Sequence, residues 1–544
     1  MSNPLDFKFV APRIVGLPRS KFDLSHSVKT TWNVGELMVI DVIDIIPGDT
    51  LDLDINMVAR SITPVSPTMD NAFMDIFAFW VPNRLIYYPQ SEATSTNKTW
   101  EKINGENPDG FWAATQETTA YMYTFIDEVK PQSILNDVGV PVGAKNFEIN
   151  PAVLNAYLLI WNRFFRDENL MNPVDVNGAS SFDNLTSTRL PVCKFHDLFT
   201  SCLPAPQRGS SVSIPLGTTA PLVTGSNYNI GSTGVVLGYS KMGGTAGRNY
   251  HNIVTSNPNA TVGSVNTVVT DTTTSASSGY PLDTTNLYTD LSDATSASIN
   301  ALRLAFQTQK VLERDARSGT RYQEMLQAHF NQYISSEIIQ EPEYLGGKRI
   351  PLSIYQVSQT SASSETSDLG YNGAFGYTAN STGRIVKSFK EHGLVIICGC
   401  ARTNKSYFQG MPKYLTKTQR FQYYMPEFSN IGEVAVPKSE LVLGATGTFG
   451  YQEAWYEYRQ MQNSIRGFMS PLANDTILNS YTYAQSLSSN PTLNADFIKE
   501  SRGSFDKTCI STSSPYQFYG DFYLDLKMTR PLPVYSIPGL IDHY

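Results

Sequence analysis

The sequence contains none of the compact motifs that mark common catalytic or nucleotide-binding sites. It has no G-x-x-x-x-G-K-[ST] phosphate loop, no H-E-x-x-H or C-x-x-C pair and no G-x-S-x-G nucleophile turn. The six histidines are scattered, and neighbours on the chain such as His196 and Asp197 usually direct their side chains apart. We therefore expect a structural histidine here, no catalytic residue and no cofactor.

Two carboxylate patterns leave other chemistries open. The paired acids of glycoside hydrolases lie far apart in sequence, so such a pair would not be visible as a motif. Asp49, Asp52 and Asp54 could supply the hard oxygen ligands that Ca²⁺ prefers. Their alternation with Leu51 and Leu53 also matches the wet face of a strand, and we favour that interpretation over a metal site.

The five cysteines do not suggest a disulfide framework, because their number is odd and their spacing irregular. Folding in a reducing compartment is the simplest explanation. Cys398 and Cys400 stand two residues apart in the apolar run GLVIICGCAR, on one face of a predicted strand. We interpret them as small buried apolar residues rather than as metal ligands.

The composition favours a β-rich protein with much of its surface covered. Of the 544 residues, 17% are charged and 12% aromatic, with 30 tyrosines and 27 phenylalanines. A large secreted β protein would share these features. No apolar signal segment is visible and no run of about eighteen apolar residues occurs, so we expect neither secretion nor membrane insertion.

The net charge of −8 argues against a chain that wraps nucleic acid with a basic tail of its own. If the protein encloses DNA, a small basic protein, polyamines or metal ions must neutralise most of the phosphate charge. Direct contact with single-stranded DNA would use cations near aromatic rings. The candidates are Arg13, Arg19, Lys21, Lys405, Lys417 and Arg420. Salt bridges between subunits and aromatic packing explain these residues equally well.

The first part of the sequence predicts antiparallel strands. Residues 1–33 contain three prolines and scattered apolar residues, which indicates an extended arm or a disordered terminus. The apolar run 37–46 and the alternating run 51–57 flank a Pro-Gly-Asp turn, so they form a hairpin or a corner. Residues 73–81 are apolar throughout, as in a strand buried on both faces. This spacing favours a sandwich over βαβ units.

Two regions carry helical periodicity. Residues 150–169 predict one helix with an aromatic stripe. A second, longer helix begins after Ser298 and ends at Gly319, which can adopt a left-handed cap. Thr320 then offers an N-cap and Gln323 a capping-box partner for a short helix to Phe330. The following EPEYLGGKRIP reads as a Pro/Gly-rich turn.

The last part of the sequence returns to strands. Residues 393–402 predict a buried strand, and residues 522–528 alternate as in an edge strand. Residues 350–390 and 470–515 are expected to be loops. Strands at both ends with loops and helices between them are typical of a jelly roll with large insertions, although periodicity alone does not distinguish it from other sandwiches.

Residues 209–297 differ from the rest, because Thr, Ser, Gly, Asn and Val dominate. Such a stretch could be a disordered linker. We favour a folded, β-rich excursion from the main body, because tyrosines recur along it in a way that linkers lack. These tyrosines are Tyr228, Tyr239, Tyr250, Tyr280 and Tyr288.

Several stretches from end to end match one protein family. The first is LERDARSGTRYQEML followed by EYLGG, within residues 298–351. The others are PRSKFDLSH (Pro18–His26), FWVPNRL (Phe79–Leu85), WNRFFRDENL (Trp161–Leu170), HDLFTSCLPAPQRG (His196–Gly209), FGYQEAWYEYR (Phe449–Arg459) and PGLIDHY (Pro538–Tyr544). The chain resembles the major capsid protein of microviruses, small icosahedral single-stranded DNA phages, and the gokushovirus branch in particular. Only the 209–297 stretch lacks a match.

The resemblance implies a mainly β fold, an antiparallel eight-stranded jelly-roll sandwich with large loop and helical insertions. It divides the chain into an extended arm (1–33), a first core part (34–208), a surface protrusion (209–297) and a second core part with the helical pair (298–544). The protrusion would cluster at the threefold axis, where its tyrosines could contact the host receptor.

The resemblance also implies a function and partners. About 60 copies would close a T=1 icosahedral shell around circular single-stranded DNA in the virion. The further partners would be a small basic DNA-binding protein, an internal scaffolding protein, a DNA pilot protein and a host surface receptor. The alternative is a secreted carbohydrate-binding or carbohydrate-active β-sandwich, which would share the aromatic, weakly charged composition.

Overall fold

The computed structural model describes most of the chain. The described residues are 18–87, 100, 122–176, 179–210, 212, 222–224, 239–240, 250–251, 287–289, 299–319, 321–335, 340–360, 369–370, 372–473 and 476–535. The chain separates into two compact units, one formed by residues 1–208 and 313–544 and the other by residues 209–312. The first boundary coincides with the start of the Thr/Ser/Gly-rich stretch, and the second lies inside a long helix.

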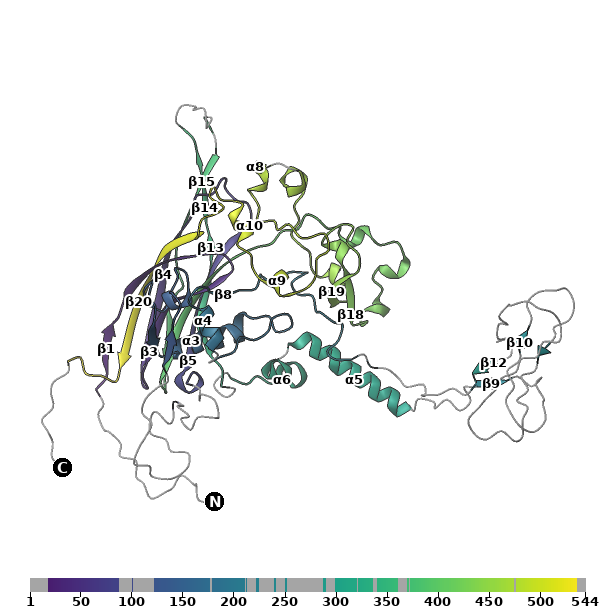
Figure 1. Ribbon diagram of the computed structural model, residues 1–544, viewed down its shortest axis with the longest axis horizontal. Coiled ribbons are helices and arrows are strands. Elements are labelled where there is room, and N and C mark those ends of the chain that lie inside the picture. Colours follow the sequence, from purple (N-terminus) through teal and green to yellow (C-terminus); the bar gives the residue numbers. More distant parts are fainter. Residues whose placement is uncertain are drawn as a thin grey trace, which may run out of the picture. The chain divides into compact units, whose positions relative to one another are not determined.

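The first unit is built on two antiparallel sheets. The five-stranded sheet has the order β13 (Glu343–Leu352), β5 (Ala72–Pro82), β17 (Gly393–Thr403), β3 (Glu36–Ile45) and β8 (Leu190–Pro191). The seven-stranded sheet has the order β1 (Ser20–Asp23), β20 (Phe518–Arg530), β4 (Thr50–Ser61), β15 (Asn372–Ser381) and β14 (Ile354–Ser358). In addition, β2 (His26–Trp32) pairs with β20 and β16 (Ile385–Ser388) with β4. Strands from the start and the end of the sequence therefore lie side by side (Figure 1).

A shared apolar core joins the two sheets. Every second residue of β4, from Leu51 to Met57, is fully buried, and so are Phe522, Leu524 and Met528 of β20. They pack in one cluster with buried residues of β3, β5 and β17. The prediction of a mainly β, antiparallel sandwich is confirmed at this level.

A second core covers the other face of the five-stranded sheet. Helix α3 (Ala152–Ile160) continues into the π-helix η2 (Trp161–Phe165), and both pack against β5 and β17. The Tyr157 hydroxyl donates to the Leu37 carbonyl at 2.9 Å and accepts from the Leu190 backbone N–H at 3.0 Å. This cover explains why β5 is apolar on both faces. The predicted helix over 150–169 is confirmed, but it ends at Phe165.

The remaining elements of the first unit are short, and in the sequence they fall in the segments that connect the sheet strands. They are η1 (Asn83–Leu85), β6 (Tyr123–Phe125), α2 (Ile134–Asp137), β7 (Phe147–Ile149), α4 (Ala179–Asn184), η3 (Lys413–Leu415), η4 (Arg420–Gln422), η5 (Pro426–Phe428), β18 (Glu433–Pro437), η6 (Lys438–Glu440), β19 (Thr448–Glu453), η7 (Tyr456–Tyr458), η8 (Gly467–Met469), η9 (Pro471–Ala473), α8 (Thr476–Asn479), α9 (Ala495–Ile498) and α10 (Gly503–Asp506). The hairpin of β18 and β19 packs in a third apolar cluster with Phe199 and Phe497.

The second unit contributes four short strands among its described residues. β9 (Leu222–Thr224) pairs with β12 (Leu287–Thr289), and β10 (Tyr239–Ser240) pairs with β11 (Tyr250–His251), both antiparallel. Most of the predicted excursion lies outside the described residues.

The helical pair follows the predicted pattern with one shifted cap. Helix α5 (Ile299–Ser318) ends at Gly319, whose φ of +91° is the predicted left-handed stop. Helix α6 (Tyr322–Phe330) starts one residue later than predicted, with Arg321 as its N-cap. Glu324, not Gln323, takes the capping-box position, because its carboxylate accepts from the Arg321 backbone N–H at 3.2 Å.

Three local predictions were wrong. The Pro/Gly-rich turn is strand β13, in which Gly347 allows the backbone to approach β5 so closely that a Cβ would lie 2.2 Å from the Ile76 oxygen. The expected loop over 350–390 contains β14, β15 and β16. The alternating run 522–528 is a strand but not an edge, because β20 lies between β4 and the pair β1 and β2.

The start of the chain also differs from the expected arm. Within residues 18–33, strands β1 and β2 both pair with β20, so this part belongs to the sheet. Residues 37–46 and 51–57 form a corner rather than a hairpin, since β3 and β4 belong to different sheets. Residues 1–17 lie outside the described residues.

Asp52, Asp54 and the two neighbouring cysteines lie as predicted, whereas Asp49 does not. Asp52 pairs with Arg384, and Asp54 accepts from Ser381 Oγ at 2.6 Å, as expected on the wet face of β4. Asp49 departs from this pattern, because it is buried in the turn before β4. Cys398 and Cys400 are buried in the apolar cluster beneath α3, as predicted for small apolar residues.

Replacing Leu524 by alanine should destabilise the unassembled chain by about 3 kcal/mol, because the side chain is fully buried between both sheets. Denaturant unfolding measures this loss. Tyr523→Ala is the matched control, since Tyr523, the residue directly before Leu524, faces the opposite side of the strand and is half-exposed. Equal losses for both variants would contradict the placement of β20.

Candidate functional site

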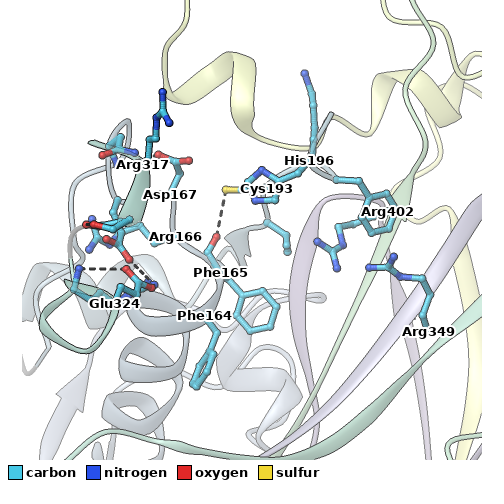
Figure 2. Close-up of a pocket in the computed structure, with 18 of the residues that line it drawn as sticks. Phe164, Phe165, Arg166, Asp167, Cys193, His196, Arg317, Glu324, Arg349 and Arg402 are labelled. Carbon is cyan, nitrogen blue, oxygen red and sulfur yellow. Dashed lines mark hydrogen bonds and ion pairs between the residues drawn. The ribbon is translucent and has the colours of Figure 1, made fainter. Parts of the chain in front are cut away.

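A cavity of about 780 Å³ opens beside the five-stranded sheet. Its walls come from the turn after η2, the segment 192–196, the junction of α5 and α6, and the strands β13 and β17 (Figure 2). Six of the lining residues are lysine or arginine and three are aspartate or glutamate. The cavity is therefore a polar one in which positive groups predominate.

Two arginines on neighbouring strands dominate one wall. Arg349 of β13 and Arg402 of β17 both donate to the buried carboxylate of Asp75 on β5, the strand between them. Their guanidinium carbons lie 4.2 and 4.3 Å from the centroid of the Phe195 ring. Figure 2 shows both arginines at the same side of the cavity. One carboxylate against two guanidinium groups leaves a net positive charge on an aromatic platform.

The opposite wall carries charges that are already paired. Arg321 contacts Glu168 and Glu324. Arg317 contacts Glu433 and lies 3.2 Å from the Glu453 carboxylate. These ion pairs fix the junction of α5 and α6 against the rest of the first unit, so this wall is mainly structural.

The cavity offers no activated nucleophile. Burial raises the pKa of the Cys193 thiol to about 11, so it stays protonated near neutral pH and cannot act as a thiolate. Burial, with a smaller effect from the Lys405 charge, lowers the pKa of Lys194 to about 8. Lys194 Nζ donates to the Phe497 carbonyl, which identifies a structural role. The cavity can attract an anion but has no group placed for covalent chemistry.

A second, aromatic cavity of about 570 Å³ lies among Tyr423, Tyr424, Trp455, Tyr458 and Arg459. Trp455 adopts a φ of +68°, which is unusual for a bulky residue, and its indole N–H donates to the Phe428 carbonyl at 2.8 Å. The four aromatic rings surround a cavity and Arg459 lies beside them. Such an arrangement is suited to stacking on a planar group.

No group of three His, Cys, Asp or Glu side chains that could hold a metal ion occurs in the part of the chain that the structure describes. In the same part, no helix is both long and apolar enough to cross a membrane.

Comparison with known proteins decides between the remaining function classes. A family model described as capsid protein (F protein) matches residues 13–540. Three proteins named capsid protein VP1 are similar along nearly their full length. They come from Bdellovibrio phage phiMH2K (34% identity over 542 residues), Chlamydia phage 1 (31% over 585) and Spiroplasma virus 4 (30% over 564), and the alignments cover 96–97% of this chain and 96% of each relative.

The chain belongs to the capsid protein (F protein) family. It is a structural, major capsid protein of a microvirus, located in the virion, and not an enzyme. The predicted resemblance is confirmed, and the carbohydrate-active alternative is not favoured.

The predicted DNA-facing residues of this capsid protein differ in how exposed and how paired they are. Arg19, Lys21 and Arg420 are exposed. Lys417 pairs with Glu457 at 2.8 Å, and its ammonium lies 4.3 Å above the Tyr458 ring.

Lys405 resembles Lys417 in that its side chain is almost fully buried, 2% exposed against 4%. The ammonium contacts Glu500 and donates to Ser504 at 2.7 Å, so it is occupied within the chain. Arg13 lies outside the described residues.

The structure shows the backbone of three of the five predicted receptor-contact tyrosines. Tyr239 of β10 and Tyr250 of β11 lie on paired strands, and Tyr288 of β12 is paired with Val223 of β9. Tyr228 and Tyr280 lie outside the described residues.

The sequence alone did not predict the candidate surfaces that distant segments form together. Arg349, Arg402 and Phe195 meet only because β5 lies between β13 and β17. Trp455 and Tyr458 were part of a family motif, but no role was assigned to them. The clustering of aromatic residues in YQEAWYEYR was the available signal.

The Lys194→Met variant should reveal the cost of burying this ammonium. The pKa of Lys194 is lowered to about 8 in the folded chain, against an ordinary value of 10.5. The unfolded chain therefore binds more protons between pH 8 and 10.5, and the wild-type stability rises across this window relative to the variant, by up to about 3 kcal/mol.

Denaturant unfolding of unassembled subunits between pH 7 and 10.5 measures this difference. Lys499→Met is the matched control, because the Lys499 side chain is partly exposed and pairs with the exposed Asp496. A difference between wild type and Lys194→Met that does not change with pH would contradict the assignment.

Proposed function

We propose that this capsid protein closes a T=1 icosahedral shell of about 60 copies around circular single-stranded DNA. The observation that carries the proposal is the full-length match to microvirus capsid proteins. The finer fold that we propose is an eight-stranded jelly roll with large insertions. It is supported by the two packed antiparallel sheets and by the pairing of the first and last described strands.

The genome would be held by weak, distributed contacts. A subunit with net charge −8 cannot neutralise the phosphates, so a small basic DNA-binding protein is the proposed partner for that task. An internal scaffolding protein and a DNA pilot protein complete the proposed set. Within this chain, the DNA-facing residues that we retain are Arg13, Arg19, Lys21 and Arg420. Lys405 and Lys417 are left out, because their side chains are almost fully buried and pair with Glu500 and Glu457.

The aromatic cavity strengthens the case for Arg420. Arg420 is exposed beside Phe421, which is 65% exposed. The buried side chain of Lys417, paired with Glu457, lies against the Tyr458 ring and so helps to hold this wall of the cavity in place. A base stacked on such rings with its phosphate near a cation is a common arrangement for single strands. This geometry favours single-stranded over double-stranded nucleic acid.

The stretch 209–297 is the proposed host-contact surface. It would project outward, with copies meeting at the threefold axis, and its tyrosines would contact a host receptor. The separation of residues 209–312 as a compact unit supports this proposal, because such a unit can change without disturbing the two-sheet core.

Arg420→Gln should weaken binding of a thirty-residue oligothymidylate and reduce the slope of log affinity against log salt by about 0.7, the value for one phosphate contact on a single strand. Fluorescence anisotropy with unassembled subunits measures both quantities. Lys438→Gln is the control, since Lys438 is a partly exposed lysine that contacts Asn490. Equal slopes for wild type and Arg420→Gln would remove this residue from the DNA surface.

Deletion of residues 209–297 should leave particles that assemble normally but no longer adsorb to host cells. Electron microscopy scores assembly, and an adsorption assay with labelled particles scores attachment. A deletion that assembles and still adsorbs, or one that prevents assembly, would count against the receptor assignment.

A further inference from the structure

The hairpin of β14 and β15 extends past the end of its sheet. Residues 377–381 of β15 pair with β4, but residues 372–376 pair with β14 alone. In Figure 1 the hairpin lies at the upper end of the main body. β14 is the last strand of the sheet, and no described strand pairs with its outer edge. A two-stranded ribbon of this kind is only marginally stable in water by itself.

The side chains of this ribbon are unusual for an edge exposed to solvent. Tyr355, Val357 and Phe375 are each 48–49% exposed, and the rings of Tyr355 and Phe375 stack at 5.4 Å. No charged residue occurs in the described segments 354–360 and 372–376. Proteins normally protect a free edge with lysine, proline or a bulge, because an unprotected edge is a template for another strand.

The backbone hydrogen bonds show which groups of β14 are free. The Ser353 carbonyl accepts from Tyr377 N at 3.1 Å, and the Gln359 carbonyl accepts from Gly370 N at 2.9 Å. Backbone groups alternate in direction along a strand, so odd-numbered residues face β15. The N–H and C=O groups of Ile354, Gln356 and Ser358 therefore point to the open edge.

We infer that β14 pairs in antiparallel fashion with β14 of a second copy, about a twofold axis through Gln356. The sequence Ile-Tyr-Gln-Val-Ser is self-complementary in this register. Gln356 meets its own counterpart, Ile354 meets Ser358, and every outward N–H and C=O group of the strand finds a partner. Tyr355 lies opposite Val357 of the second copy, an aromatic and β-branched pair of the kind that stabilises sheets.

A second copy of this chain is the partner that fits best. A capsid protein must contact copies of itself, and an isologous contact uses the same surface on both subunits. The pairing rests on the proposed icosahedral shell, which contains twofold axes. It would join two seven-stranded sheets into one continuous sheet across the axis.

A cysteine cross-link tests the register. In Gln356→Cys particles, mild oxidation should convert most subunits to disulfide-linked dimers on a non-reducing gel, because residues paired across the axis lie about 5.5 Å apart between Cα atoms. Ile354→Cys is the matched control, since its own counterpart would be four residues further along, about 13 Å away. Wild-type particles control for the native cysteines, of which four are buried and Cys193 is partly buried.

Lysines introduced into β14 test whether assembly of the particle requires the pairing of β14 with β14 of a second copy. Tyr355→Lys with Val357→Lys should reduce the particle yield at least tenfold while the melting temperature of the unassembled subunit is unchanged. Val386→Lys is the control, because Val386 is exposed on strand β16 between Arg384 and Lys387, where a charge is tolerated.

The outcomes separate the pairing from the proposed function. Intact particles with monomeric Gln356→Cys, or with dimers of Ile354→Cys, overturn the pairing alone. Normal particle yield for the double lysine variant overturns it as well. A wild-type chain that forms no closed particles with its viral partners overturns the proposed shell, whereas dimers of Gln356→Cys in the unassembled protein would still support the pairing.

Discussion

The antiparallel pairing of β20 with β4 is the constraint on which the rest of this capsid protein depends. It runs unbroken from Phe518 opposite Ser61 to Thr529 opposite Thr50, and so joins opposite ends of the sequence. Its inner face carries a row of fully buried side chains, each worth about 1.5–3 kcal/mol on burial. Because the entropy cost of closing a loop grows only slowly with its length, long insertions between these strands are tolerated.

This arrangement separates the polar groups that hold the chain together from the surfaces that are candidates for recognition. The buried polar groups hold segments together: Arg189 pairs with Asp137 at 2.6 Å, and Lys405 with Glu500, both inside the protein. The candidate surfaces for recognition are the aromatic cavity around Trp455, the two arginines on the Phe195 ring and the uncharged ribbon of β14 and β15. A subunit that must contact several neighbours at once requires such surfaces rather than one catalytic centre.

Local sequence signals predicted the elements well where one physical requirement dominated. The alternation of Leu51 to Met57 predicted a half-buried strand, the continuous apolar run at 393–402 predicted a fully buried one, and Gly319 predicted a helix end. The glycines of β13 wrongly predicted a turn, because Gly347 permits close packing of neighbouring strands instead. The alternation of apolar and polar residues in β20 predicted one solvent-exposed face. It could not show that other strands pair with both edges of β20.

The candidate sites were less predictable, because they depend on neighbours in the sheet. Arg349 and Arg402 are far apart in sequence, and each is unremarkable by itself. Lys405 looked like a surface cation beside aromatic residues, yet Glu500 neutralises it in the interior. Charge type and spacing do not show whether a lysine has a buried partner.

The central claim is that this chain builds a closed shell, and the mass of native particles tests it most directly. Native mass spectrometry and electron microscopy on particles from the viral source should give uniform shells containing ~60 copies of the 60.3 kDa chain, or about 3.6 MDa of it. Particles near 60.3 kDa, without nucleic acid absorbance, would contradict the account.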